Sequence, residues 1–185
     1  MCGIVGYVGN KSVVDILLDG LEQLEYRGYD SAGIAVFDHG NIKVKKCKGR
    51  LANLVEKMDE EGKPQGHVGI GHTRWATHGE PSDINSHPHG NKRVTIVHNG
   101  IIENYKKLKD FLVGEGYSFA SETDTEVAAK LLDYYYDGDP MKTIAKVLSE
   151  IKGSYALGIM FRDFPDEIFA VRKDSPLIVG VGEHE

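Results

Sequence analysis

The stretch Met1-Cys2-Gly3-Ile4-Val5-Gly6 opens the chain and places a cysteine directly before a short apolar run. The run predicts a buried strand over residues 4–8. Because a small residue after Met1 favours removal of the initiator methionine, we expect Cys2 to carry both a thiol and a free α-amine. An α-amine has a pKa of about 7.7–8.0, so it could act as a base that makes the thiol a nucleophile. Alternatively, Cys2 is a small buried hydrophobe at the start of the strand.

The composition indicates one globular domain. The chain has 185 residues, of which 41% are hydrophobic and 27% charged. Its net charge of -6 argues against a nucleic-acid or anionic-membrane partner. The two cysteines, Cys2 and Cys47, form no disulfide framework, and the N-terminus has neither the basic nor the long apolar segment of a signal peptide. We therefore expect a cytoplasmic protein without a membrane span.

Hydrophobic periodicity predicts an α+β fold. Strands are expected over residues 4–8, 31–37, 42–48, 67–72, 93–98, 154–162, 167–172 and 177–181. Helices are expected over residues 10–24, from Ile101 to Gly114 or Gly116, over 123–132, and from Pro140 to Gly153. Strands, then paired helices, then strands again favour two sheets with helices layered on them over a βαβ alternation. The last predicted strand lies so near residue 185 that we expect the chain to stop before its domain is complete.

A long stretch separates the strands at 67–72 and 93–98, and such loops are commonly functional. It begins with His72-Thr-Arg-Trp-Ala-Thr-His-Gly79. Arg74 offers a planar fork that can hold a carboxylate by two hydrogen bonds, or it pairs on the surface with an acid such as Glu80. Trp75 is either a lid over a ligand or a core residue.

Two further segments allow a structural or a chemical interpretation. Asn99-Gly100 is a favoured turn dipeptide, but its amide N–H groups could also form an oxyanion hole for acyl transfer. Asp124 lies in the first turn of a predicted helix, where the macrodipole alone would stabilise an acid. Alternatively, Asp124 pairs with a ligand ammonium. In that case Arg74 and Asp124 together would recognise both ends of an α-amino acid.

Several histidines fall in or near the long loop and are candidate metal ligands. Zinc sites usually show tighter spacing with cysteine or carboxylate partners. We therefore expect structural roles for these histidines, with no metal and no cofactor in the protein. The residues concerned are His72, His78, His87, His89 and His98.

Five motifs occur in order: Met1-Cys-Gly-Ile-Val-Gly6, Tyr26-Arg-Gly-Tyr-Asp-Ser-Ala-Gly33, His72-Thr-Arg-Trp-Ala-Thr-His-Gly79, His98-Asn-Gly100 and Ser121-Glu-Thr-Asp-Thr-Glu126. With them the chain resembles the glutaminase domain of the glucosamine-6-phosphate synthases, which are class II glutamine amidotransferases. The resemblance covers essentially the whole chain. It implies an N-terminal-nucleophile hydrolase fold, an αββα sandwich of two mostly antiparallel sheets between helix layers.

The resemblance also implies a role for each matching residue. Cys2 would be the nucleophile and its α-amine the base, with Asn99 and Gly100 as the oxyanion hole. Arg74 would hold the α-carboxylate of L-glutamine and Asp124 its α-ammonium. The remaining implied positions are Thr77 and His78 in a loop that closes over glutamine, Trp75 at the exit toward a partner domain, and Arg27 beside the N-terminus.

The expected domain is thus residues 1–185, a type 2 glutamine amidotransferase domain truncated at its C-terminal end. The resemblance implies that the sugar-isomerase domains of the family, which use the ammonia to convert fructose-6-phosphate to glucosamine-6-phosphate, are not part of these 185 residues. The full-length enzyme is expected to be a homodimer. The alternatives are a silent glutamine-binding fragment, the glutaminase domain of another class II amidotransferase, a metal-binding domain and an N-terminal-nucleophile peptidase.

Overall fold

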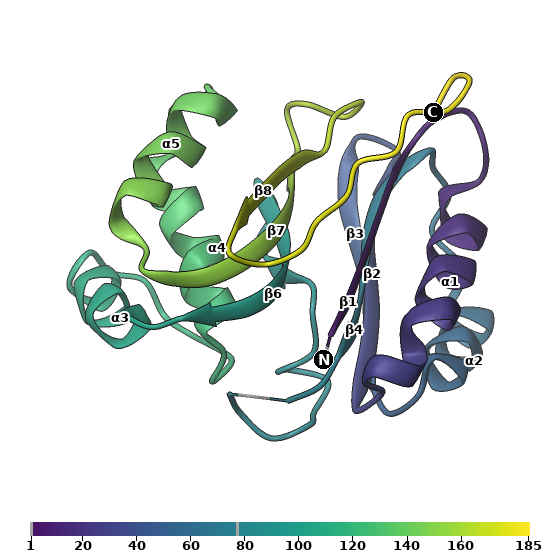
Figure 1. The fold of residues 1–185 in the computed structure, drawn as a ribbon, viewed down its shortest axis with the longest axis horizontal. Coiled ribbons are helices and arrows are strands. Elements are labelled where there is room, and N and C mark those ends of the chain that lie inside the picture. Colours follow the sequence, from purple (N-terminus) through teal and green to yellow (C-terminus); the bar gives the residue numbers. More distant parts are fainter. Residues whose placement is uncertain (1, 77) are drawn as a thin grey trace.

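Two four-stranded sheets face each other in the computed structural model, which describes residues 2–76 and 78–185 (Figure 1). Helices cover the outer side of each sheet, so the layers run helix, sheet, sheet, helix. All pairs of neighbouring strands within the sheets are antiparallel. The αββα sandwich predicted from the sequence is therefore confirmed.

The first sheet comes from the N-terminal part of the chain and has the strand order β1-β4-β2-β3. Two helices, α1 and α2, pack on its outer face (Figure 1). The strands are β1 (Gly3–Val8), β2 (Ser31–Asp38), β3 (Asn41–Lys48) and β4 (Val68–Arg74), and the helices are α1 (Val13–Leu24), followed by a short 3₁₀ turn (Glu25–Arg27), and α2 (Leu51–Glu61).

The second sheet has the order β5-β6-β7-β8 and is covered by the other three helices (Figure 1). Its strands are β5 (His89–Gly90), β6 (Val94–Ile102), β7 (Gly153–Phe161) and β8 (Phe169–Lys173), and its helices are α3 (Tyr105–Gly114), α4 (Asp124–Tyr135) and α5 (Pro140–Glu150). None of the helices in the described ranges is long and apolar enough to cross a bilayer.

The alternating directions of successive residues along β4 show how the layers pack. Val68 and Ile70 point into the apolar layer between the sheets, where they meet Val97 of β6. Gly69 and Gly71 point the other way, toward α1. A Cβ on Gly71 would lie 2.9 Å from Leu21 Cδ1, so its missing side chain permits the close packing of helix and sheet.

Three details differ from the sequence prediction. Helix α2 was missed, although its buried residues Leu51, Leu54 and Met58 follow helical spacing. The run 177–181 forms no strand, and Ile178 and Val181 are 91% and 92% exposed. Strand β6 extends to Ile102, because it stays paired with β7 over its whole length, so the helix after it begins only at Tyr105.

Candidate active site

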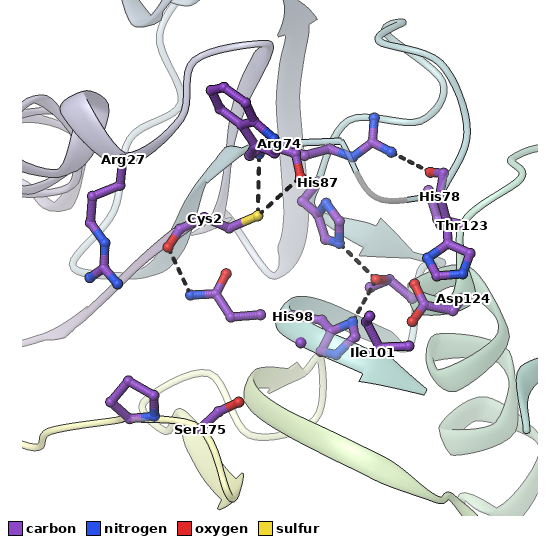
Figure 2. Close-up of a pocket in the computed structure, with 15 residues that line it drawn as sticks. Cys2, Arg27, Arg74, His78, His87, His98, Ile101, Thr123, Asp124 and Ser175 are labelled. Carbon is purple, nitrogen blue, oxygen red and sulfur yellow. Dashed lines mark hydrogen bonds between the residues drawn. The ribbon is translucent and has the colours of Figure 1, made fainter. Parts of the chain in front are cut away.

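A cavity of about 500 Å³ opens at the end of the sandwich where β1 begins and β4 ends (Figure 2). Both sheets and the N-terminus of α4 contribute to its walls. Eight of the nine site residues predicted from the sequence line it, and the ninth, Thr77, lies outside the described residues. The eight are Cys2, Arg27, Arg74, Trp75, His78, Asn99, Gly100 and Asp124.

Strand register places Cys2 and Arg74 at this end. Gly3 of β1 pairs with Thr73 of β4, so the residue before Gly3 and the residue after Thr73 lie side by side. Arg74 also follows Ile70 by four positions, and side chains two apart share one face of a strand. It therefore points toward the second sheet, as Ile70 does.

The Cys2 thiol lies among backbone groups at the start of β1. The Trp75 N–H donates to Cys2 Sγ at 3.2 Å, and Asn99 Nδ2 donates to the Cys2 carbonyl oxygen at 3.2 Å (Figure 2). Burial raises the pKa of the Cys2 thiol, while the Trp75 hydrogen bond acts in the opposite direction. A thiol in this setting holds its proton at neutral pH, so its use as a nucleophile requires a base.

Asn99 and Gly100 lie within β6 and form no turn. Gly100 has a φ of +123°, and a Cβ at this position would lie 2.1 Å from the carbonyl oxygen of Ser154 on β7. Only glycine fits such a backbone. The turn interpretation of Asn99-Gly100 is therefore wrong, because the strand continues through both residues.

Arg74 is 2% exposed, and its guanidinium extends along the cavity wall (Figure 2). Nη2 donates to the carbonyl oxygens of His78 and, at 3.0 Å, of Gly79. Nη1 is buried and has no hydrogen-bond partner among the described residues. Arg74 thus orders the loop after β4 with one nitrogen, and its hydrogen bonds go to backbone carbonyls rather than to Glu80.

Asp124 is the first residue of α4, and its placement depends on the cap of that helix. Thr123 Oγ1 accepts from the Glu126 N–H at 3.2 Å, which is one of the two hydrogen bonds of a capping box. The Glu126 carboxylate, however, accepts from the N–H groups of Ala120 and Ser121, which fixes the chain before the helix. Asp124 is 4% exposed, and its Oδ2 accepts from the Ile102 N–H at 2.8 Å.

Four histidines are buried beside the cavity, and two of them, His87 and His98, line it. Thr125 Oγ1 bridges His87 Nε2 at 2.8 Å and His98 Nδ1 at 2.9 Å, and His89 Nε2 lies 3.1 Å from Thr123 Oγ1. Burial lowers the pKa of all four, to about 3 for His72 and His89. Within residues 2–76 and 78–185, no group of three or more His, Cys, Asp or Glu side chains is arranged to hold a metal ion.

A lysine holds the loop that carries His87. Lys46 of β3 donates from Nζ to the carbonyl oxygens of Ile84, Ser86 and Pro88, at 3.2, 2.7 and 3.2 Å. Burial lowers the pKa of Lys46 to about 8. These contacts fix the segment that leads from the cavity into β5.

Sequence reasoning identified the charged residues of the site but missed part of its wall. His87, His98, Thr123, Thr125 and Ser175 also line the cavity. Their partners come from other elements, so nothing in the local pattern indicated their positions. Trp75 is 56% exposed, which rules out the core interpretation of this residue.

The buried histidines predict a stability that falls in mild acid. The unfolded chain binds a proton at each histidine below pH ~6.5, whereas native His72 and His89 do so only near pH 3. Between these values the unfolded state holds more protons, so the free energy of unfolding decreases as the pH falls. We expect a loss of about 2 kcal/mol per histidine from pH 7 to pH 5.

Urea unfolding at both pH values measures this loss. His89→Gln should reduce the difference between pH 7 and pH 5, whereas His67→Gln at an exposed position should leave it in place. Equal unfolding free energies at the two pH values would contradict the prediction.

Comparison with known proteins identifies the family of the chain. The profile of the glutamine amidotransferase domain family matches residues 72–183. The glutamine–fructose-6-phosphate aminotransferases (isomerizing) of Clostridium tetani and Thermus thermophilus are 59% and 52% identical to the chain, over 100% of its length. The chain spans 31% of the length of each of these two relatives.

Solved structures show the same fold. Glutamine phosphoribosylpyrophosphate amidotransferase from B. subtilis, in complex with ADP and GMP, matches 88% of the chain with a TM-score of 0.75 and 30% identity, over 35% of its own length. A glutamine aminotransferase class-II domain protein from Silicibacter pomeroyi matches 80% of the chain and 71% of its own with a TM-score of 0.59. Its 16% identity supports the fold alone. The family profile covers more than half of the residues of the chain, so the chain belongs to the glutamine amidotransferase domain family. Its fold is the sandwich of the N-terminal-nucleophile hydrolases.

Proposed function

We propose that this chain is a glutaminase that hydrolyses L-glutamine to glutamate and ammonia through a thioester at Cys2. The observation that carries the proposal is one cavity lined by a thiol, an amide pair, a buried arginine and a buried carboxylate. These are Cys2, Asn99 with Gly100, Arg74 and Asp124. The combination supplies a nucleophile, an oxyanion site and two charges of opposite sign.

The two charges suit the α-amino acid end of glutamine. Arg74 Nη1 is buried without a partner among the described residues, and a ligand carboxylate would satisfy it. Asp124 uses Oδ2 for the Ile102 N–H, which leaves its other oxygen for an α-ammonium. With both ends of the amino acid held, the side-chain carboxamide is directed toward Cys2.

The reaction would proceed by acyl transfer. After removal of Met1, the Cys2 α-amine takes the thiol proton, directly or through water, and the thiolate attacks the carboxamide carbon. Asn99 and Gly100 hold the oxyanion of the tetrahedral intermediate. The C–N bond then breaks, ammonia leaves with the transferred proton, and water hydrolyses the thioester to glutamate and free Cys2.

The length of the relatives supports a role within a larger enzyme. We propose that residues 1–185 are the glutaminase part of a glutamine–fructose-6-phosphate aminotransferase, whose sugar-isomerase domain turns fructose-6-phosphate into glucosamine-6-phosphate with the released ammonia. Trp75, more than half exposed at the cavity, suits the exit toward that domain. His78 would belong to a loop that closes over glutamine, Arg27 would help to fix the N-terminus, and the full-length enzyme would be a cytoplasmic homodimer.

The similarity to the phosphoribosylpyrophosphate amidotransferase favours a second candidate, a glutaminase domain that serves another acceptor. The cavity chemistry proposed above would be the same. A glutamine-binding fragment without turnover is the remaining alternative. Glutamate release by this chain separates that fragment from a glutaminase, and amination assays with the longer protein separate the acceptors.

Release of glutamate and ammonia from L-glutamine is the test of this function. We expect turnover by the chain and none by Cys2→Ala, which removes the nucleophile. Cys47→Ala is the matched control, because Cys47 is buried in the first sheet away from the cavity. Mass spectrometry should show that active protein has lost Met1. Turnover that persists in Cys2→Ala would refute the proposal, and glutamine binding without turnover would favour the silent fragment.

Asn99→Ala tests the oxyanion site. Loss of one oxyanion donor typically lowers kcat by about 10²–10³-fold, because the donor acts on charge that develops only in the transition state. We expect such a loss with a KM for glutamine that changes little. Steady-state kinetics measures both constants, and an unchanged kcat would remove Asn99 from the oxyanion site.

Asp124→Asn tests recognition of the ammonium. The variant can still accept from the Ile102 N–H but has lost its charge, so we expect the KM for glutamine to rise at least about tenfold. Asp110→Asn on the exposed side of α3 is the control. 4-Carbamoylbutanoate, which lacks the α-ammonium, should be an equally poor substrate for the wild-type chain and for Asp124→Asn. An unaltered KM for glutamine would reject this role of Asp124.

A further inference from the structure

The cavity wall includes a hydrogen bond between the sheets that the mechanism above does not use. We propose that His72 is a positioning residue: its imidazole holds the Asn99 amide so that the NH₂ group, and not the oxygen, faces the reacting atoms. The inference rests on the proposed glutaminase function and adds a residue to it.

Strand alternation places His72 opposite Asn99. On β4, His72 follows Ile70 on the face that points to the second sheet, and on β6, Asn99 follows Val97 on the face that points to the first. His72 is fully buried, with 0% exposure. At the cavity end of the sandwich, a polar pair thus replaces the apolar pairs found farther inside.

The position of the imidazole hydrogen follows from its neighbours. His72 Nε2 lies 3.0 Å from the backbone carbonyl oxygen of His98 and 2.9 Å from Asn99 Oδ1. Because a carbonyl oxygen can only accept, Nε2 must carry the hydrogen. His72 Nδ1 is buried and has no hydrogen-bond partner among the described residues, so nothing there competes for the hydrogen.

The other end of the amide independently fixes the same orientation. Asn99 Nδ2 lies 3.2 Å from the carbonyl oxygen of Cys2, which is also only an acceptor. A flipped amide would bring its NH₂ group against the N–H of His72 and its oxygen against the oxygen of Cys2. Both contacts would be repulsive. One hydrogen of the NH₂ group is used by Cys2, and the other remains for the oxyanion.

The surroundings keep His72 neutral. Burial lowers the pKa of His72 to about 3, and the hydrogen bonds to Asn99 and to the His98 carbonyl offset this only in part. The ring of His87 lies 4.2 Å away, centroid to centroid. The imidazole therefore donates one hydrogen bond to Asn99 without adding a positive charge beside Cys2, and it does so over the whole neutral pH range.

The experiment is a double-mutant cycle in this chain, with glutamine hydrolysis as the readout. His72→Leu removes the donor, His72→Gln can restore an N–H at the position of Nε2, and Asn99→Ala removes the group that is positioned. Each variant, and the double variant with His72→Leu and Asn99→Ala, is measured for kcat, for the KM for glutamine and for the rate of Cys2 alkylation by iodoacetamide. Thermal unfolding shows whether each variant is folded.

We expect His72→Leu to lower kcat at least about tenfold, within the range that one oxyanion donor contributes. Its KM and its alkylation rate should stay within about twofold of wild type, because Asn99 acts after glutamine has bound. His72→Gln should recover most of the loss. The double variant should be no slower than Asn99→Ala alone, since a positioning residue has nothing left to position.

Three outcomes would overturn the inference: an unchanged kcat in His72→Leu, a loss that His72→Gln does not recover, or additive losses in the double variant. If His72→Leu does not fold, His72→Gln is compared with Asn99→Ala instead. A loss of kcat in His72→Gln as large as that in Asn99→Ala would then contradict the positioning role of His72. Absence of Cys2-dependent turnover in the wild-type chain would instead refute the proposed function.

Discussion

The contact between the two sheets at Asn99 is the constraint on which the cavity depends. Asn99 belongs to the second sheet, but its amide bonds to His72 on β4 and to Cys2 just before β1, both at the cavity end of the first sheet. The apolar layer of Val68, Ile70 and their neighbours fixes how far apart the sheets lie. A slip of β4 by one residue would turn His72 and Arg74 away from the second sheet and open the cavity wall.

Burial sets the electrostatics of the site. It raises the pKa of the Cys2 thiol, lowers the pKa of the histidines and leaves one nitrogen of Arg74 without a partner among the described residues. With a protonated thiol and neutral imidazoles, the nucleophile lacks a base, and Nη1 of the buried Arg74 guanidinium lacks an acceptor among the described residues. An α-amine on Cys2 and a carboxylate on the ligand would complete the proposed site.

Most elements could be predicted because their signals are local. Apolar alternation and helical spacing marked the strands and most helices, and Thr123 marked the start of α4. Two of the three failures came from strand pairing. Strand β6 extends through Asn99 and Gly100 because β7 supplies its hydrogen-bond partners, whereas Leu177 to Val181 is apolar but has no paired strand. Helix α2 carried the right spacing in Leu51, Leu54 and Met58, but only three buried positions marked it.

The sequence by itself determined the fold class, the family and the residues expected to act on glutamine, because short ordered motifs and side-chain chemistry carry that information. The tertiary structure decided which of these residues lie next to one another. Register brings Cys2 beside Arg74, and strand faces bring His72 against Asn99. The tertiary structure also decided the protonation state of His72, because the pKa of this residue depends on its burial between two sheets. These sheets are formed by segments that lie far apart in the sequence. Such effects have no local signal, because they arise from neighbours that only folding supplies.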